Sequence, residues 1–130
     1  MKLITGIING KIADQERLNE IFLSFEDSSD TIHALLRLRI GNGSGPAFIR
    51  ELHVFGPEVP LGENPGNNPQ HRGLGQKLMA EAEHICLTES EKRKISVISG
   101  VGAREYFRKF GYELNGSYMT KELIPQAQRY

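Results

Sequence analysis

The sequence predicts an α/β fold in which a central mixed sheet, with parallel and antiparallel strands, is flanked by helices. Three observations lead to this prediction. Segments of alternating apolar and polar residues dominate the first half of the chain, as expected for strands. A Gly-rich run at residues 70–75 opens an amphipathic helix, and a strand, a short helix and a final strand follow it. Strands that alternate with helices in this order suit a mixed sheet with helices packed on it.

Length and composition are those of one compact unit. The chain has 130 residues, of which 38% are hydrophobic and 25% are charged. It is therefore long enough to bury a core, and it shows no bias toward disorder. We expect a single domain that spans residues 1–130.

The first twenty residues are the least regular part of the sequence. Asn9 and Gly10 predict a turn, because this pair tolerates the backbone conformations that tight turns need. Residues 13–20 fit either a short helix or an irregular lead-in, and their pattern does not decide between the two. The first strand is therefore expected to begin at residue 20.

Three strands are predicted in the rest of the first half. Apolar residues alternate along residues 31–40, which places Leu36, Leu38 and Ile40 on one face of a strand. Arg37 and Arg39 lie on the other face. In chain order we expect a strand at 20–26, a turn at 27–30, a strand at 31–40, a turn at 41–46 and a strand at 47–54. The first two of these strands form a hairpin.

The second half contains the helices. Residues 56–69 hold four prolines and predict a long surface loop. Apolar residues then recur every three to four positions, which predicts one buried helical face. That face consists of Leu74, Leu78, Met79, Ala82, Ile85 and Cys86. A strand at 94–99, a turn, a helix at 103–110 ended by Gly111 and a strand from Tyr112 complete the expected fold.

The Gly-rich run Q-H-R-G-L-G is suited to bind a phosphate. Gly73 and Gly75 have no Cβ to block a ligand, and the amides of the first helical turn lack acceptors within the helix. With the helix dipole behind them these amides favour an anion, and we predict a diphosphate. The run matches neither the dinucleotide-binding fingerprint nor the P-loop. The predicted cofactor contacts here are Gln70, His71, Arg72, Gly73, Leu74, Gly75, Gln76 and Lys77.

The pattern Q-x-x-G-x-G resembles the coenzyme A pyrophosphate loop of the GNAT superfamily of N-acetyltransferases. FLSFED from Phe22, ELHV from Glu51 and ISGVG from Ile98 also resemble, in the same order, the acetyltransferase domain of the catalytic subunit of the Elongator complex. The likeness runs from about residue 22 to about residue 121. It implies the GNAT fold, with acetyl-CoA as co-substrate and its pantetheine arm between the strands that end near Val54 and Ser99.

The Elongator resemblance also implies a setting. In that family the subunit carries a radical-SAM domain and takes part in modifying the wobble uridine of tRNA. A chain of this length is expected to stand alone, without that domain.

Acetyl transfer to an amine needs a proton acceptor, a stabilised oxyanion and a protonated thiol leaving group. Along the strand at 47–54, Leu52 and Val54 share one face, so Glu51 and His53 share the other. If the apolar face is core, Glu51 and His53 meet the substrate cleft. A desolvated carboxylate or an imidazole can take a proton near neutral pH, so both are candidate bases. The alternative is that Glu51 pairs with an arginine and His53 is a satisfied surface residue.

The backbone of the same strand is predicted to hold the thioester. A free strand edge pairs with the pantetheine amides as another strand would. The predicted contacts are Glu51, Leu52, His53 and Val54. The resemblance places the oxyanion at a backbone amide where the strand bends, near His53 and Val54.

The leaving-group acid departs from the GNAT pattern. Many members of the superfamily carry a tyrosine beside the cofactor thiol, four residues before the glycine of the G-Y pair, and this chain has Phe107 there. Tyr106 could substitute with a slight rotation of the helix, but adjacent helical residues point about 100° apart. A thiol with an ordinary pKa of about 8.5 also leaves tolerably without an acid. Both options stay open.

These residues predict an N-acetyltransferase that moves acetyl from acetyl-CoA to a lysine or small amine by direct attack in a ternary complex. Two alternatives stay open. One is a non-catalytic acyl-CoA binding or sensing module, which Phe107 favours. The other is an acetyl-CoA-binding subunit that joins a separate radical-SAM partner in tRNA modification.

Composition limits the other function classes. The single cysteine, Cys86, lies on the apolar stripe, so we expect a core residue and neither a nucleophile nor a metal ligand. Zero formal net charge predicts that the chain alone binds tRNA weakly. The absence of a signal sequence predicts a cytoplasmic protein that does not enter a membrane. The amine acceptor, and whether the chain is a monomer or a homodimer, stay open.

Overall fold

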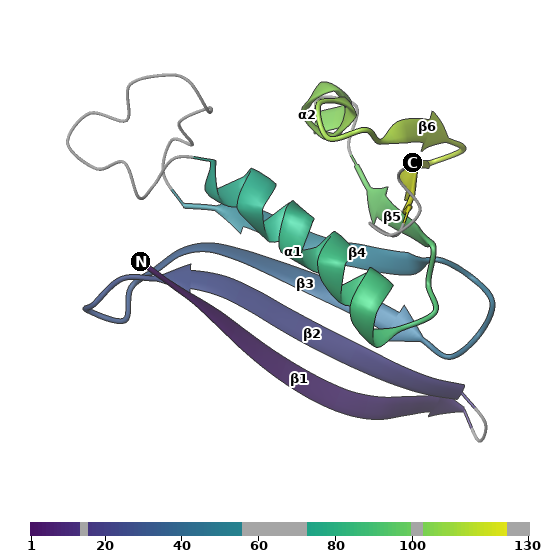
Figure 1. Ribbon diagram of the computed structural model, residues 1–130, viewed down its shortest axis with the longest axis horizontal. Helices are drawn as coiled ribbons and strands as arrows, with labels where there is room; N and C mark the ends of the chain where they lie inside the picture. The colour runs from purple at the N-terminus through teal and green to yellow at the C-terminus, as the bar shows by residue number, and fades with distance from the viewer. Residues whose placement is uncertain (14–15, 56–72, 100–102, 125–130) are drawn as a thin grey trace.

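The structure is a computed structural model that describes residues 1–13, 16–55, 73–99 and 103–124. The described residues form one seven-stranded sheet and two helices (Figure 1). In chain order these are β1 Lys2–Ala13, β2 Glu16–Glu26, β3 Ile32–Gly41, β4 Ala47–Val54, α1 Leu74–Glu89, β5 Lys94–Ile98, α2 Arg104–Arg108, β6 Glu113–Asn115 and β7 Tyr118–Glu122.

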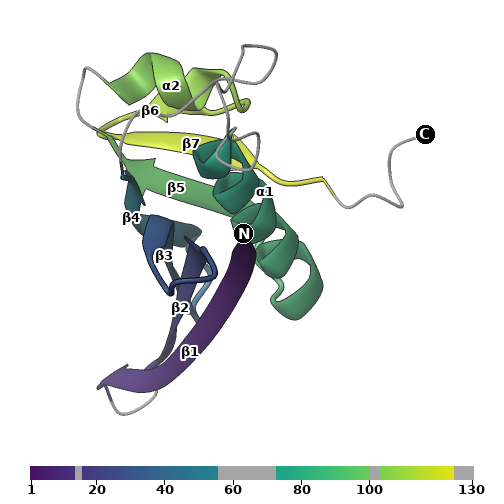
Figure 2. The same ribbon diagram turned by 90° about the vertical axis from the view of Figure 1, so that its left-hand side faces the viewer.

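The sheet is mixed, as predicted. Its strand order is β1-β2-β3-β4-β5-β7-β6. β4 and β5 pair in parallel, and every other neighbouring pair is antiparallel. Figure 2 shows the strong twist of the sheet, with β1 and β2 at one end and β6 and β7 at the other. The predicted fold class, a mixed sheet flanked by helices, is confirmed.

The prediction for the N-terminus was wrong. Asn9 and Gly10 lie inside β1, where they pair with Asn19 and Leu18 of β2. Ala13 and residues 16–20 are in strands and not in a helix or an irregular lead-in, because β1 ends at Ala13 and β2 begins at Glu16. Residues 14 and 15 lie outside the described residues. The long antiparallel pairing of β1 with β2 outweighs the local preference of Asn-Gly for a turn, since tertiary pairing routinely overrides local propensity.

The other strands follow the sequence pattern closely. β2 and β3 form the expected hairpin, and the turn between them is held by the Asp27 carboxylate. That carboxylate accepts bonds from the backbone amides of Ser29 and Thr31 and lies 2.7 Å from Nε2 of His33. These contacts, the one to His33 foremost, lower the pKa of Asp27 to about 2. The single strand expected from Tyr112 is instead a hairpin, β6 and β7, which turns at Gly116 with a φ of 63°.

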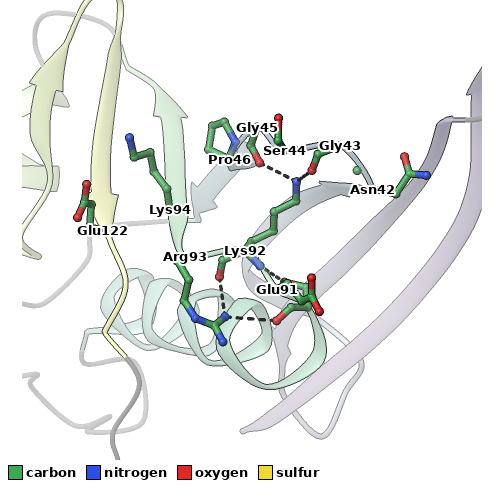
Figure 3. Close-up of a pocket in the computed structure, with 12 residues that line it drawn as sticks. Asn42, Gly43, Ser44, Gly45, Pro46, Glu91, Lys92, Arg93, Lys94 and Glu122 are labelled. Atoms are coloured by element: carbon green, nitrogen blue, oxygen red, sulfur yellow. Dashed lines mark hydrogen bonds between the residues drawn. The ribbon is translucent and has the colours of Figure 1, made fainter. Parts of the chain in front are cut away.

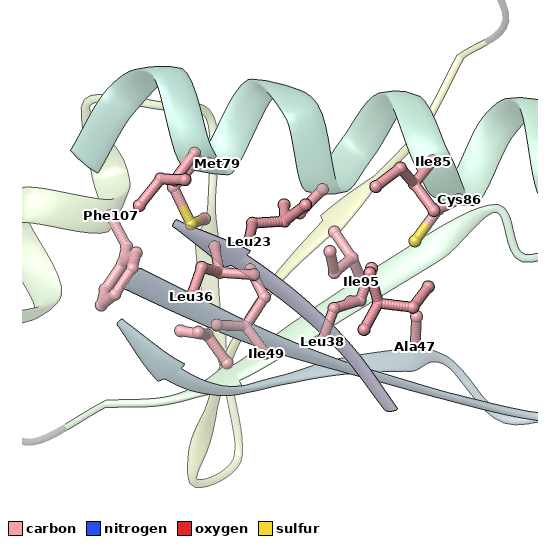
Figure 4. Packing of buried hydrophobic residues seen from close by; sticks show 14 of the residues in the cluster. Leu23, Leu36, Leu38, Ala47, Ile49, Met79, Ile85, Cys86, Ile95 and Phe107 are labelled. Carbon is pink, nitrogen blue, oxygen red and sulfur yellow. The ribbon is translucent and has the colours of Figure 1, made fainter. Parts of the chain in front are cut away.

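The hydrophobic core lies between α1 and one face of the sheet. Every residue of the predicted apolar stripe of α1 is buried: Leu74, Leu78, Met79, Ala82, Ile85 and Cys86. Figure 4 shows this stripe above Leu23, Leu36, Leu38 and Ile49, with Phe107 of α2 packed beside Met79. Burial raises the pKa of the Cys86 thiol to about 12, which agrees with a structural cysteine and not with a nucleophile.

A polar cluster joins α1 to the C-terminal hairpin. Glu83 of α1 accepts one hydrogen bond from the Tyr112 hydroxyl (3.0 Å) and one from Lys121 Nζ (2.9 Å). Lys121 also donates to the carbonyl of Phe110 at 2.8 Å. Gly111 has a φ of +91°, and a Cβ there would lie 3.3 Å from Cε of Lys121. The predicted helix at 103–110 is shorter in the structure, because α2 ends at Arg108 and Lys109 caps it. Gly111 still has the left-handed backbone expected of a glycine after a helix, and close packing adds a second reason for glycine there.

Candidate active site

A gap opens between the two parallel strands. β4 pairs with β5 only at Ala47–Ile49, opposite Ile95–Val97. On its other side, β4 pairs with β3 as far as Val54. Within the part of the chain that the structure describes, residues 50–54 therefore have no strand partner on the β5 side. The expected divergence of the strands ending near Val54 and Ser99 is confirmed.

A β-bulge at Arg50 sets which side chains of β4 face outward and which face the core. In the pairing of β3 with β4, Arg37 lies opposite Glu51 and Leu38 opposite Ile49, so Arg50 is an extra residue. Such a bulge shifts the alternation of the strand by one position. The bend that the resemblance implies near His53 and Val54 stays a prediction, and the irregularity in the pairing of β3 with β4 lies at Arg50.

The shift has a direct effect on burial. Before the bulge, Ala47 and Ile49 are buried against the core; after it, Leu52 and Val54 pack on the same core. Glu51 and His53 therefore point to the sheet face opposite α1. The prediction that Leu52 and Val54 share the inner face and Glu51 and His53 the outer one is confirmed.

The hydrogen-bond pattern of β4 shows which backbone amides point into the gap. The amide of Phe55 donates to the carbonyl of His33 at 2.9 Å. In an antiparallel pair, residues alternate between pointing their backbone groups at the partner strand and away from it. His53 and Glu51 therefore direct their backbone groups at β3, whereas Leu52 and Val54 direct theirs at the open edge.

Glu51 connects two basic side chains on the outer face. Its Oε1 lies 2.9 Å from Nε2 of His53, and its Oε2 lies 3.9 Å from Nε of Arg37. Because a carboxylate only accepts, Nε2 of His53 carries the proton in this contact, and the neutral ring then keeps Nδ1 as an acceptor. His53 is 57% exposed and Glu51 37%, so solvent and a substrate can reach both. Glu51 was expected either to act as a base beside His53 or to pair with an arginine, and in the structure it contacts both His53 and Arg37.

The start of α1 has the geometry expected of an anion site. Gly73 adopts a left-handed conformation, with φ 61° and ψ 34°, just before the helix. Glycine accepts this conformation readily. The first turn of α1 contains no acidic side chain, and Gln76 and Lys77 are exposed there. Gln70, His71 and Arg72, the other predicted contacts of the loop, lie outside the described residues, as do the predicted loop at 56–69 and the turn at 100–102.

Topology brings these parts to one end of the sheet. β4 and β5 are parallel and are joined through α1, so α1 runs back along them and begins near their carboxyl ends (Figure 1). α2 follows the carboxyl end of β5. In such sheets, ligands bind at the carboxyl ends of the strands where neighbouring connections diverge.

The two candidate positions for the leaving-group acid differ in burial. Phe107 is 7% exposed and belongs to the core. Tyr106 is half-buried and lies edge-on to Phe107 and Phe110, with ring centroids 5.3 and 4.9 Å apart. At the position where the superfamily has a tyrosine, this chain therefore has a core phenylalanine.

A second hollow lies at the opposite end of the sheet and contains none of the predicted site residues. This cavity, of about 750 Å³, is lined by residues 41–46, residues 90–94 and Glu122 (Figure 3). Lys92 Nζ crosses it and donates to the carbonyls of Gly43 and Gly45. The contact ties together the two loops that precede β4 and β5.

The residues that the structure describes contain no group of three or more His, Cys, Asp or Glu side chains able to hold a metal ion. None of their helices has the length and apolar character needed to cross a membrane.

Comparison with known proteins identifies the class of this chain. Residues 67–126 match the family model of the acetyltransferase (GNAT) domain. The chain therefore contains a GNAT acetyltransferase domain, and the Elongator resemblance seen in the sequence is borne out by its relatives.

Those relatives are long proteins. The chain is 52% identical over 114 residues to the tRNA uridine(34) acetyltransferase of Dehalococcoides mccartyi, with 80% of this chain and 25% of the relative covered. It is 47% identical over 113 residues to human Elongator complex protein 3, with 80% and 21% covered. The structure of Elp3 from the archaeon Methanocaldococcus infernus matches with a TM-score of 0.66 at 42% identity, over 92% of this chain and 30% of that one. The chain thus spans about a quarter of the curated relatives it matches.

Sequence reasoning missed two residues that shape this site. Arg37 was seen only as one of several surface cations, yet it is the cross-strand neighbour of Glu51. Arg50 was not recognised as a bulge. Its signal is in the sequence: the apolar positions of β4 are Ala47 and Ile49, then Leu52 and Val54, and such a change from odd to even marks an extra residue.

We predict that the open edge is visible in amide hydrogen exchange. The amides of Leu52 and Val54 should exchange faster than those of Glu51 and His53, which are directed at β3, because exchange requires an unbonded amide. Residue-resolved exchange on the full chain measures this. Equal protection along Glu51–Val54 would contradict the predicted edge.

Proposed function

We propose that this chain is an N-acetyltransferase that moves the acetyl group of acetyl-CoA to the amine of a lysine or a small molecule by direct attack in a ternary complex. The observation that carries the proposal is the outward-facing pair Glu51–His53, on the same strand as two amides aimed at an unpaired edge. The membership of the GNAT class supports acetyl-CoA as the donor.

Acetyl-CoA would lie along two features of the site. The start of α1, from Gly73 to Lys77, would receive the diphosphate, because its amides and the helix dipole favour an anion. The open edge at Leu52 and Val54 would pair with the pantetheine amides as an added strand. Both features lie at the carboxyl ends of β4 and β5, so one extended ligand can reach them together.

The reaction would then use the groups around β4. The amine loses its proton to Nδ1 of His53, directly or through water, while Glu51 holds the opposite ring nitrogen. The amine nitrogen attacks the thioester carbon, and the oxyanion that forms accepts a hydrogen bond from the amide of Leu52 or Val54. Collapse of this intermediate breaks the carbon–sulfur bond, and the nitrogen releases its second proton to solvent. The thiolate takes a proton from solvent, or from Tyr106, which solvent then reprotonates.

A second candidate function is favoured by the names of the relatives. The Dehalococcoides protein is named for acetyl transfer at tRNA uridine 34. By that analogy, the chain would be an acetyl-CoA-binding subunit working with a radical-SAM partner on tRNA. The isolated chain has zero formal net charge, so we expect it to bind tRNA only weakly and with a steep salt dependence. Nanomolar tRNA affinity at physiological salt, or co-purification with such a partner, would place this candidate first.

The first test of the proposal concerns the donor site. Gly73→Asn retains the left-handed backbone, which asparagine tolerates, but it adds a side chain where the diphosphate would lie. Affinity for acetyl-CoA should fall by at least about tenfold, or 1.4 kcal/mol, by calorimetry. Gly116→Asn is the matched control, because that glycine is also left-handed and lies in the distant β6–β7 turn. Equal affinity in the Gly73 variant would remove the loop from the site.

The second test concerns the base. Acetyl-CoA is supplied with a panel of amines, and products are identified by mass. His53→Gln and Glu51→Gln should each lower kcat/KM by about a hundredfold, the usual contribution of a general base. Glu122→Gln, an exposed change on β7, serves as the control. Binding of acetyl-CoA without acetylation of any amine would instead indicate the non-catalytic acyl-CoA module.

The third test concerns the leaving-group acid. Tyr106→Phe should slow acetyl transfer if its hydroxyl protonates the thiolate, and Phe107→Tyr should raise the rate if a hydroxyl at that position can reach the thiol. Steady-state rates at saturating acetyl-CoA measure both. Changes of less than about threefold in either variant, under about 0.7 kcal/mol in the barrier, would show that no tyrosine acts as the acid.

A further inference from the structure

The free edge of β1 is the longest unpaired edge in the described sheet. β1 has 12 residues, whereas β6 at the opposite edge has three. No described residue pairs with the outer side of β1. About half of the backbone groups of an antiparallel edge strand point outward, so β1 presents a row of donors and acceptors that no described strand pairs with.

The features that usually protect an edge strand are missing from most of β1. Between Lys2 and Lys11 there is no charge and no proline, and the irregular pairing with β2 is confined to the end, between Lys11 and Ala13. Large apolar side chains are exposed on both faces of the strand. Ile7 is 55% exposed on the side of α1, and Ile4 is 39% exposed on the other. Such a strand is a template for pairing with another chain.

We infer that β1 pairs with β1 of a second copy of this chain and so forms an antiparallel, two-fold symmetric dimer. The sequence of the strand is self-complementary around Gly6. With the two-fold axis at Gly6, Thr5 lies opposite Ile7 of the other copy. This places two β-branched residues side by side, which is a favourable cross-strand pair.

Charge and space fit the same register. The axis at Gly6 puts Lys2 opposite Gly10 and Lys11 opposite Met1, so no lysine faces a lysine. A Cβ added at Gly6 would meet nothing within 4 Å, so the face of the sheet at the centre of the contact is open. Closed symmetry also ends the assembly at two copies, because the other edge of the sheet is short.

The dimer would have a defined layout. The two-fold axis is perpendicular to the sheet, so α1 of both copies covers the same face of a continuous sheet. Glu51 and His53 of both copies then open onto the opposite face. The pairing does not involve the acetyl-CoA site, and it would hold whether or not the proposed reaction is correct.

Charge substitutions on the exposed strand test the inference. Thr5→Lys with Ile7→Lys puts a lysine opposite a lysine in both symmetric contacts. Sedimentation and light scattering over a concentration series should show a dimer for the unmodified chain. In the double variant the dissociation constant should rise by at least about tenfold. Leu114→Lys on β6 is the matched control, because it adds a charge at the opposite, short edge and should leave the dimer intact.

A charge-reversed partner tests the register. Thr5→Glu with Ile7→Glu should be monomeric alone, and an equal mixture with the lysine double variant should restore a particle of two chains. Circular dichroism confirms that each variant is folded. A monomeric mass for the unmodified chain throughout the series would overturn the inference. A dimer that survives the lysine substitutions, or a mixture that stays monomeric, would overturn it as well.

Discussion

The extra residue at Arg50 is the constraint on which the site depends. β4 is a central strand with α1 on one side, so its alternation decides what enters the core. Without the bulge, the odd-numbered pattern of Ala47 and Ile49 would continue, and Glu51 and His53 would be driven under α1. Burying an unpaired carboxylate there would cost several kcal/mol. The bulge avoids this cost, and it lets a strand that supports the core also carry a polar pair outward.

The two faces of the sheet have different tasks. The inner face and α1 carry the hydrophobic burial that stabilises the fold. The outer face holds ion pairs: Arg39 with Glu20 at 2.7 Å, and Arg37 with Glu51 at 3.9 Å. Partly exposed pairs of this kind contribute about 0–1 kcal/mol each. Substitutions among them therefore change the charge of the outer face more than they change stability.

Most of the fold could be read from the sequence because burial imposes its period on each element. The stripe of α1, the alternation of β3 and the glycine at residue 111 each have one physical cause that acts locally. β1 could not be read in this way. Its residues are held by cross-strand pairing with β2 along the whole strand, whereas Asn9 and Gly10 give a local signal that points to a turn.

In the candidate site, too, features with a local cause could be predicted from the sequence, and features that depend on strand pairing could not. The faces of Glu51 and His53 follow from alternation, which the sequence displays. The contact of Glu51 with Arg37 depends on the register of two strands, and register is set by the whole hairpin, not by either strand alone. Burial of Phe107 is of the same kind, since it results from how α2 packs against the hydrophobic core.

The hydrogen bonds from Lys92 to the carbonyls of Gly43 and Gly45 have a consequence for how this domain can vary. They fasten the loops before β4 and β5 at the end of the sheet where the two strands are also hydrogen-bonded. The strands diverge only at the far end. The paired ends of β4 and β5 and the gap between their other ends are thus separate parts of the molecule, made by different residues. Natural variation can change the residues that line the gap while the contacts that hold the two loops together stay unchanged.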